Sequence, residues 1–246
     1  MAILECKKVS KNFGGLAAVS NIDLTIRQGE IVGLIGPNGA GKTTLFNLIS
    51  GALPCKSGTI SFKGKIISGL KPHQICRLGI ARTFQSAKVF NNMTVTTNVM
   101  LGSLFGKLPG LSSAEAKQIT ADCIEAVGLA DMSNVMANDL TIVNKKRLEV
   151  ARALSTRPEL LMLDEVMAGL NPTEFAQAME LVKKIRAKGI TILMIEHVMK
   201  AIMNICDRIA VLHHGEKIAE GTPQEISSNR TVIEVYLGEQ VDAQGK

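Results

Sequence analysis

The segment Gly36–Thr43 (GPNGAGKT) has the spacing G-x-x-x-x-G-K-[ST], which is typical of loops that bind phosphate groups. Glycines let the backbone wrap closely and present N–H groups to phosphate oxygens. Lys42 can reach the terminal phosphates of a nucleotide, and the Thr43 hydroxyl can bind magnesium. The apolar run Ile31–Ile35 precedes the loop, and the helical pattern of Thr43–Ser50 follows it, so that a helix directs its positive end at the phosphates.

Acidic residues follow a second apolar run, Leu160–Leu163. Ligands bind at the carboxyl ends of buried parallel strands. We therefore expect Asp164 to hold magnesium and Glu165 to polarise an attacking water. His197 follows a third apolar run, Ile190–Ile195, where it could contact the terminal phosphate or orient the water. The alternative for His197 is a surface histidine at the start of a helix.

The composition excludes several other classes of protein. The chain has 246 residues, a net charge of +6 and 46% hydrophobic residues, which is typical of a globular protein with a substantial core. With no Trp and one Tyr, it lacks the stacking platforms of a single-stranded nucleic-acid reader, and we expect no nucleic-acid partner. Five scattered cysteines predict reduced thiols in a cytosolic protein rather than a zinc site. The longest uncharged run, Val89–Gly106, is too polar to span a membrane, and the first residues lack the apolar stretch of a signal peptide.

The elements that must position these side chains change character along the chain. The N-terminal third is typical of strands, the middle from about residue 88 to 157 has little strand signal, and the last third returns to α/β order. This pattern predicts a helical subdomain inserted into an α/β core. The predicted strands and hairpins are Asn21–Arg27, Ile31–Ile35, Thr59–Ile67, Leu160–Leu163, Ile190–Ile195 and Arg208–Ala219. The predicted helices are Thr43–Ser50, Ala114–Val127 (after Ser112 and Ser113 as cap candidates), Lys145–Leu154 and Pro172–Ala187.

The order of these features, over Leu4 to Gly238, resembles the nucleotide-binding subunit of an ABC transporter. Finer motifs resemble the LivG-type ATPase of branched-chain amino-acid importers, and the ATPases of urea and amide importers share much of the pattern. The motifs that carry the resemblance are Asn12–Val19 (NFGGLAAV), Arg82–Gln85 (RTFQ), Met93–Val95 (MTV), Arg147–Leu154 (RLEVARAL), Ala168–Pro172 (AGLNP), Ile195–His197 (IEH) and Tyr236–Glu239 (YLGE).

The resemblance implies a fold and a division of the chain. The fold class is α/β, with a P-loop NTPase (RecA-like) core, an N-terminal antiparallel β subdomain and an inserted α-helical subdomain. One ABC ATPase domain spans residues 1–246. Within it, 1–87 and 158–246 form the α/β core with the β subdomain, and about 88–157 form the helical subdomain.

The resemblance also assigns roles to individual residues, with ATP and Mg²⁺ as cofactors. Catalysis falls to Glu165, His197 and Gln85, a residue for which sequence pattern alone gives no role. Magnesium falls to Thr43, Gln85 and Asp164. ATP binding falls to Phe13, which stacks on the adenine, to Val19 beside it, and to Gly36, Pro37, Asn38, Gly39, Ala40, Gly41, Lys42, Thr43 and Thr44.

One segment departs from the family. The signature loop, Leu-Ser-Gly-Gly-Gln in most members, corresponds here to the degenerate segment Leu140, Thr141, Ile142, Val143 and Asn144. Glycine permits close approach of backbone N–H groups to the ATP held by a partner subunit, whereas a β-branched valine adds bulk and stiffness. We therefore expect activity to depend on a partner, in a heterodimer with one competent and one impaired site. A homodimer is the alternative.

The function implied is an ATPase that energises solute import, most directly for branched-chain (hydrophobic) amino acids. The alternatives are a urea or amide importer ATPase, a regulatory nucleotide-binding subunit with impaired hydrolysis, and a DNA-repair or translation ATPase, which the short helical insert disfavours. The partners implied are a second ABC ATPase subunit, two transmembrane permease subunits and, indirectly, an external solute-binding protein. The place implied is the cytoplasmic face of the inner (plasma) membrane, as a peripheral subunit.

Overall fold

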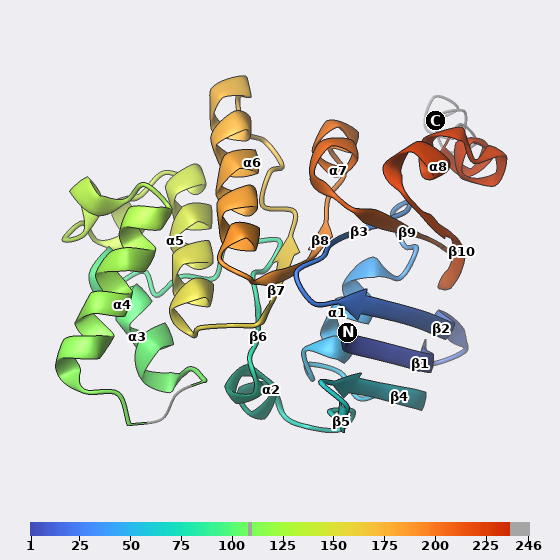
Figure 1. Cartoon of the computed structure of the whole chain (residues 1–246), viewed down its shortest axis with the longest axis horizontal. Helices are drawn as coiled ribbons and strands as arrows, with labels where there is room; N and C mark the ends of the chain where they lie inside the picture. Colours follow the sequence, from blue (N-terminus) through green and yellow to red (C-terminus); the bar gives the residue numbers. More distant parts are fainter. Residues whose placement is uncertain (108–109, 237–246) are drawn as a thin grey trace. The chain divides into compact units, whose positions relative to one another are not determined.

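The computed structural model describes residues 1–107 and 110–236, and Figure 1 draws it with colours that follow the sequence. The chain folds as two compact units. The first unit combines Met1–Lys71 with the chain from Thr191 onward, and the second is Pro72–Ile190. The predicted helical segment, residues 88–157, lies within the second unit. Among the described residues, no helix has the length and apolar character that a membrane span needs.

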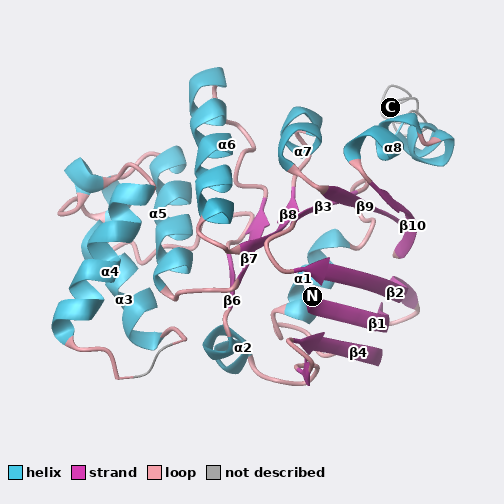
Figure 2. Ribbon diagram, viewed as in Figure 1, coloured by secondary structure: helices cyan, strands magenta, loops and turns pink. Residues whose placement is uncertain are grey.

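An antiparallel sheet occupies the N-terminal part of the first unit, with strand order β2-β1-β4-β5. Figure 2 shows β2, β1 and β4 in this order. Its strands are β1 (Ala2–Phe13), β2 (Leu16–Arg27), β4 (Ser57–Phe62) and β5 (Lys65–Ile66). Alternation places Ile22, Leu24 and Ile26 on the buried face of β2, as the sequence predicts. The turn between β1 and β2 leaves Phe13 exposed at the end of its strand.

A mostly parallel set of strands forms the rest of the first unit, in the order β10-β9-β3-β8. Its elements are β3 (Ile31–Ile35), α1 (Lys42–Ile49), β8 (Thr191–Ile195), α7 (Met199–Ile205), β9 (Arg208–His213), β10 (Glu216–Gly221) and α8 (Pro223–Ser228). The strands β3 and β8 are parallel neighbours and are buried along their whole length. Their carboxyl ends therefore meet at one edge, where the phosphate loop and His197 begin.

The second unit contains two parallel strands, β6 (Ile80–Arg82) and β7 (Leu160–Asp164), with helices around them. The helices are α2 (Pro72–Leu78), α3 (Val95–Phe105), α4 (Ser113–Ala126), α5 (Ile142–Ser155) and α6 (Pro172–Ala187), with short 3₁₀ turns at Ala130–Met132 and Ala137–Asp139. The carboxyl ends of β6 and β7 lie side by side, and Gln85 and Glu165 follow them.

Local signals fixed most helix ends. The Ser112 side chain and Glu115 form a reciprocal capping box at the start of α4, which confirms the predicted cap. Asn171 and Glu174 do the same for α6, with Pro172 in the first turn. The predicted bounds of β3 and α6 are confirmed, whereas α5 begins at Ile142 rather than at Lys145. The Thr141 hydroxyl accepts a hydrogen bond from the Asn144 N–H, and this cap starts the helix three residues early.

Candidate functional site

The phosphate loop of the first unit has backbone conformations that require glycine. Gly36 and Gly41 have φ angles of 147° and 99°. A Cβ on Gly36 would lie 2.1 Å from the Leu212 carbonyl oxygen, and one on Gly41 would lie 2.3 Å from the Ala18 carbonyl oxygen. The loop therefore packs tightly onto neighbouring backbone, and its N–H groups keep the conformation that a phosphate cradle needs.

Lys42 is only 6% exposed although it carries an ammonium group. Its Nζ donates hydrogen bonds to the carbonyl oxygens of Gly36 (2.6 Å) and Pro37 (2.7 Å). These carbonyls belong to the loop itself, so the ammonium is held over the turn that would surround a phosphate. Phosphate oxygens are stronger partners for an ammonium than neutral carbonyls, and a bound nucleotide can take over these hydrogen bonds.

The other predicted site residues of the first unit are Phe13, Val19 and His197, and they differ in exposure and in neighbours. Phe13 is 48% exposed, and the Lys11 ammonium lies 5.6 Å from its ring centroid. Val19 is fully buried, and its Cγ2 lies 3.5 Å from the position that a Cβ would take on Gly41. It thus packs against the phosphate loop. His197 is exposed, two residues after β8.

Asp164 ends β7 in the second unit and is 2% exposed. Its Oδ2 lies 3.4 Å from Arg82 Nη2, and its backbone N–H donates to the Thr83 hydroxyl over 3.0 Å. Burial lowers the pKa of the Arg82 guanidinium, and the nearby carboxylates of Asp164 and Glu149 oppose that shift. The Asp164 carboxylate therefore has the Arg82 guanidinium as its counter-charge. It lies at the carboxyl end of its strand, where a magnesium ligand is expected.

Gln85 and Glu165 are brought together. The Gln85 Nε2 donates a hydrogen bond of 3.0 Å to the Glu165 Oε2. Glu165 has a φ of 51°, which is the left-handed region that non-glycine residues rarely adopt. Strain of this kind at a carboxylate that follows a buried strand is typical of a functional position.

The predicted metal ligands suit magnesium in their chemistry. Thr43, Gln85 and Asp164 offer a hydroxyl, an amide and a carboxylate oxygen, which are hard donors of the type that Mg²⁺ prefers. Among the described residues, no group of three or more His, Cys, Asp and Glu side chains could form a metal site on its own.

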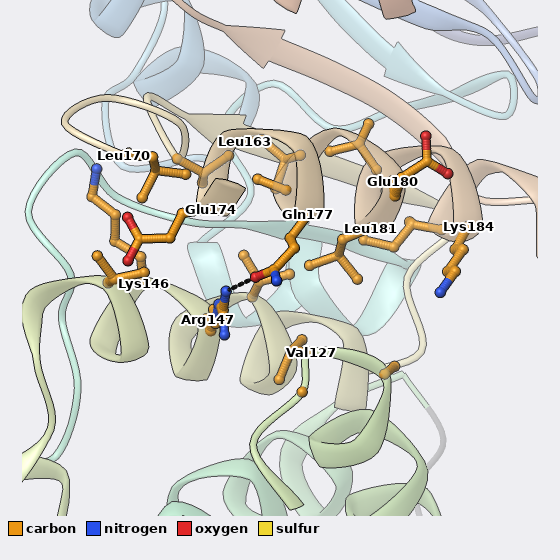
Figure 3. Close-up of a pocket in the computed structure, with 18 of the residues that line it drawn as sticks. Val127, Lys146, Arg147, Leu163, Leu170, Glu174, Gln177, Glu180, Leu181 and Lys184 are labelled. Atoms are coloured by element: carbon orange, nitrogen blue, oxygen red, sulfur yellow. Dashed lines mark hydrogen bonds between the residues drawn. The ribbon is translucent and has the colours of Figure 1, made fainter. Parts of the chain in front are cut away.

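The degenerate signature segment forms the start of a helix. Thr141 is its N-cap, Ile142 is 76% exposed, and Val143 faces a cavity of about 580 Å³ between α5 and α6. Arg147 donates a 2.6 Å hydrogen bond to Gln177 across this cavity (Figure 3). The two lysines that follow the segment bind backbone carbonyl oxygens. Lys145 donates to the Asn138 carbonyl, and Lys146 donates to the carbonyls of Glu165 and Ala168.

Sequence reasoning missed Glu149 and Arg152, which hold the loop that carries Gln85. Glu149 is 2% exposed, and its carboxylate accepts the backbone N–H groups of Phe84 (3.2 Å) and Lys88 (3.0 Å). Burial raises the pKa of Glu149, and these two hydrogen bonds counter the shift. The available signal was a glutamate in the middle of a predicted helix, directly between the apolar residues Leu148 and Val150.

Comparisons with known proteins agree with the nucleotide-binding site described above. The family model described as "ABC transporter" matches residues 19–168, and the model described as "Branched-chain amino acid ATP-binding cassette transporter" matches residues 216–242. The chain is 43% identical to the high-affinity branched-chain amino acid transport ATP-binding protein LivG of Salmonella typhimurium, over 96% of the chain and 98% of that protein. It is 41% identical to the corresponding protein BraF of Pseudomonas aeruginosa, over the same shares of each.

Solved structures with a similar fold are ATP-binding cassettes of ABC transporters. The crystal structure of the ADP conformation of MJ1267, an ATP-binding cassette of an ABC transporter, matches with a TM-score of 0.86 at 30% identity, over 97% of this chain and 99% of that one. The expectation that the drifted segment Leu140–Asn144 makes activity depend on a partner is not borne out by these comparisons. The chain belongs to the ABC transporter family, as an ATP-hydrolysing cassette subunit of the LivG type.

Proposed function

We propose that the chain couples the hydrolysis of Mg-ATP to the import of branched-chain amino acids. The observation that carries this proposal is the 43% identity to LivG across 96% of the chain, together with the intact phosphate loop and the Gln85–Glu165 pair. The match of the branched-chain model at residues 216–242 supports the solute class. The urea, amide and purely regulatory alternatives are not favoured, because the similar relatives are branched-chain amino acid transport proteins.

The roles that we propose follow the chemistry of each side chain. The loop Gly36–Thr44 binds the phosphates, with Lys42 on the terminal ones, and Phe13 stacks on the adenine with Val19 behind it. Thr43, Gln85 and Asp164 hold Mg²⁺, which would neutralise developing charge on the phosphates. Glu165 orients and polarises the attacking water, and His197 contacts the terminal phosphate.

The partners that we propose are two permease subunits in the membrane, with an external solute-binding protein beyond them, and a second ATPase subunit. The chain would act as a peripheral subunit on the cytoplasmic face. We favour a heterodimer because Leu140–Asn144 lacks both signature glycines. In the architecture proposed, residues 1–87 and 158–246 are the α/β core, and about 88–157 are the helical subdomain that faces the permease.

The solute is tested by uptake. Cells that lack the gene for this chain are complemented with the wild type or with Glu165→Gln, and the uptake of labelled leucine, urea and acetamide is measured. We expect only leucine uptake to return, and only with the wild type. Restored urea or acetamide uptake with unchanged leucine uptake would refute the proposed solute.

The pairing is tested by Mg-ATP hydrolysis of the purified chain over a range of protein concentrations. A homodimer gives a rate that rises faster than linearly with protein concentration, and this result would exclude an obligate heterodimer. A heterodimer gives a higher rate per active site when the second ATPase subunit is added. The variant that combines Ile142→Gly and Val143→Gly shows whether restored glycines permit self-pairing.

A further inference from the structure

Three polar residues of α5 are spaced three apart and contact both loops of the Gln85–Glu165 pair. They are Lys146, Glu149 and Arg152. Residues at this spacing follow one another along one side of a helix. All three lie within the second unit, as do the loops that they contact.

Lys146 contacts the loop after β7. Its ammonium donates hydrogen bonds to the backbone carbonyl oxygens of Glu165 (3.1 Å) and Ala168 (2.7 Å). Figure 3 shows the side chain extending from α5 toward the segment that carries Leu170. Glu165 is in the left-handed conformation, which is unfavourable by about 1 kcal/mol for a residue with a Cβ. A charged donor on the carbonyl of that residue stabilises the turn that directs its carboxylate.

Glu149 contacts the loop after β6, one helical step farther along. Its two carboxylate oxygens accept the N–H groups of Phe84 and Lys88, which lie on either side of Gln85. One buried carboxylate thus fixes both ends of a short loop. The Arg82 guanidinium and the Lys88 ammonium lie 4.5 and 4.7 Å from the ring centroid of Phe84, and they hold this ring as well.

Arg152 completes the row. Its Nη2 donates to the Lys88 carbonyl oxygen, and the same group lies 3.9 Å from the Glu149 carboxylate. Lys88 is therefore held at its N–H by Glu149 and at its carbonyl by Arg152. The guanidinium also lies 5.3 Å from the Phe90 ring centroid. The backbone of this loop has partners on one rigid helix, rather than in solvent.

We propose that Lys146, Glu149 and Arg152 are positioning residues for ATP hydrolysis, which fix the loops of Gln85 and Glu165 so that the two side chains meet. This inference rests on the proposed roles of Gln85 and Glu165. None of the three touches the reacting atoms. Their effect is on the geometry of the water-activating pair, and a misplacement of about 1 Å at such a pair can reduce a rate about a hundredfold.

The first experiment reads the loop backbone without reference to activity. Amide hydrogen exchange of the full chain is measured for the wild type and for Glu149→Gln. Glutamine keeps the volume of glutamate but replaces one acceptor oxygen with a donor. We expect faster exchange of the Phe84 or Lys88 amide, with unchanged exchange in β3 and β8 of the other unit. Unchanged exchange at both amides would overturn the role of Glu149.

The second experiment separates positioning from binding. The kcat and KM for Mg-ATP are measured for Lys146→Met, Lys146→Arg and the matched control Lys145→Met. Lys145 is the neighbouring lysine, and it donates to the Asn138 carbonyl oxygen rather than to the loop of Glu165. We expect Lys146→Met to lower kcat about tenfold or more with KM nearly constant. We expect the arginine variant to recover most of that loss and the control to match the wild type.

The outcomes distinguish the inference from the function. Equal kcat values for Lys146→Met and Lys145→Met would overturn the role of Lys146. A wild type that fails to hydrolyse ATP, even with its partner subunits, would instead refute the proposed function, and the hydrogen exchange of Glu149→Gln would still report on the loop. The thermal unfolding of each variant is also measured, to test whether a lower rate comes from a partly unfolded chain.

Discussion

The Gln85 amide donates a 3.0 Å hydrogen bond to the Glu165 carboxylate, from residues that are 80 positions apart in the chain. Both follow parallel strands that end at the same edge, β6 and β7. The amide limits the directions in which the carboxylate can point, so a water that binds to the other oxygen has a defined position. The pair therefore links the loop after β6 to the group proposed to activate water.

Removal of this amide should slow hydrolysis more than it weakens ATP binding. For Gln85→Ala we expect kcat to fall about tenfold or more, because the carboxylate loses a positioning hydrogen bond that matters in the transition state. The measurement is steady-state Mg-ATP hydrolysis. The control is Gln118→Ala, which removes a similar amide–carboxylate bond to Asp122 on the exposed side of α4. Equal rates for the two variants would contradict the prediction.

A methyl group on Gly41 should damage the phosphate loop. Its Cβ would lie 2.3 Å from the Ala18 carbonyl oxygen at a φ of 99°. We expect Gly41→Ala to lower the free energy of unfolding by at least about 2 kcal/mol and to weaken the binding of a fluorescent ATP analogue. Gly39 also has a positive φ, but a Cβ there meets no atom within 4 Å. Gly39→Ala should therefore cost only about 1 kcal/mol in urea unfolding.

The buried thiols should make stability fall at alkaline pH. Burial is the main cause that raises the pKa of Cys6 and of Cys206 from 9.0 to about 12. Above pH 9 the unfolded chain releases these protons and the folded chain retains them, so unfolding becomes more favourable as pH rises toward 12. Each thiol should contribute a slope of about 1.4 kcal/mol per pH unit in that window.

Urea unfolding between pH 8 and pH 10.5 measures this slope. The double variant Cys6→Ala, Cys206→Ala should show a flatter dependence than the wild type, because the titration of lysines and tyrosine is common to both. The native chain should also leave both thiols unmodified by a thiolate-specific reagent at pH 8. An identical pH slope in the two proteins would show that the thiols do not contribute.

The buried side chain of Asn98 should be important for the segment at residues 90–94. Its Oδ1 accepts the Phe90 N–H over 2.9 Å, and its Nδ2 lies within 3.3 Å of the carbonyl oxygens of Phe90, Met93 and Thr94. We expect Asn98→Ala to lower the free energy of unfolding by about 2 to 4 kcal/mol, because several buried polar groups lose their partner. Asn204→Ala, which removes one exposed hydrogen bond, should change it by less than about 1 kcal/mol. Urea unfolding of both variants decides the point.

The sequence predicted those features whose cause is local. The phosphate loop is one contiguous segment of glycines, small residues and a lysine. The strand Ile31–Ile35 is a single apolar run, and the caps of α4 and α6 depend on residues within one helical turn. Residue spacings of this kind can be recognised in a short stretch of sequence, because the interactions that stabilise each element lie within that stretch.

Only the tertiary structure decided which side chains meet. Glu149 reaches the Phe84 N–H across 65 positions, and Arg82 reaches Asp164 across 82. Lys146 is an ordinary helix lysine in the sequence, yet its ammonium binds the carbonyl of Glu165. No periodicity encodes such contacts, because they depend on how packed strands and helices bring distant segments to the same edge. The sequence thus determined which reactive side chains are available, and the packing of α5 against the two loops determined how Gln85 and Glu165 are positioned.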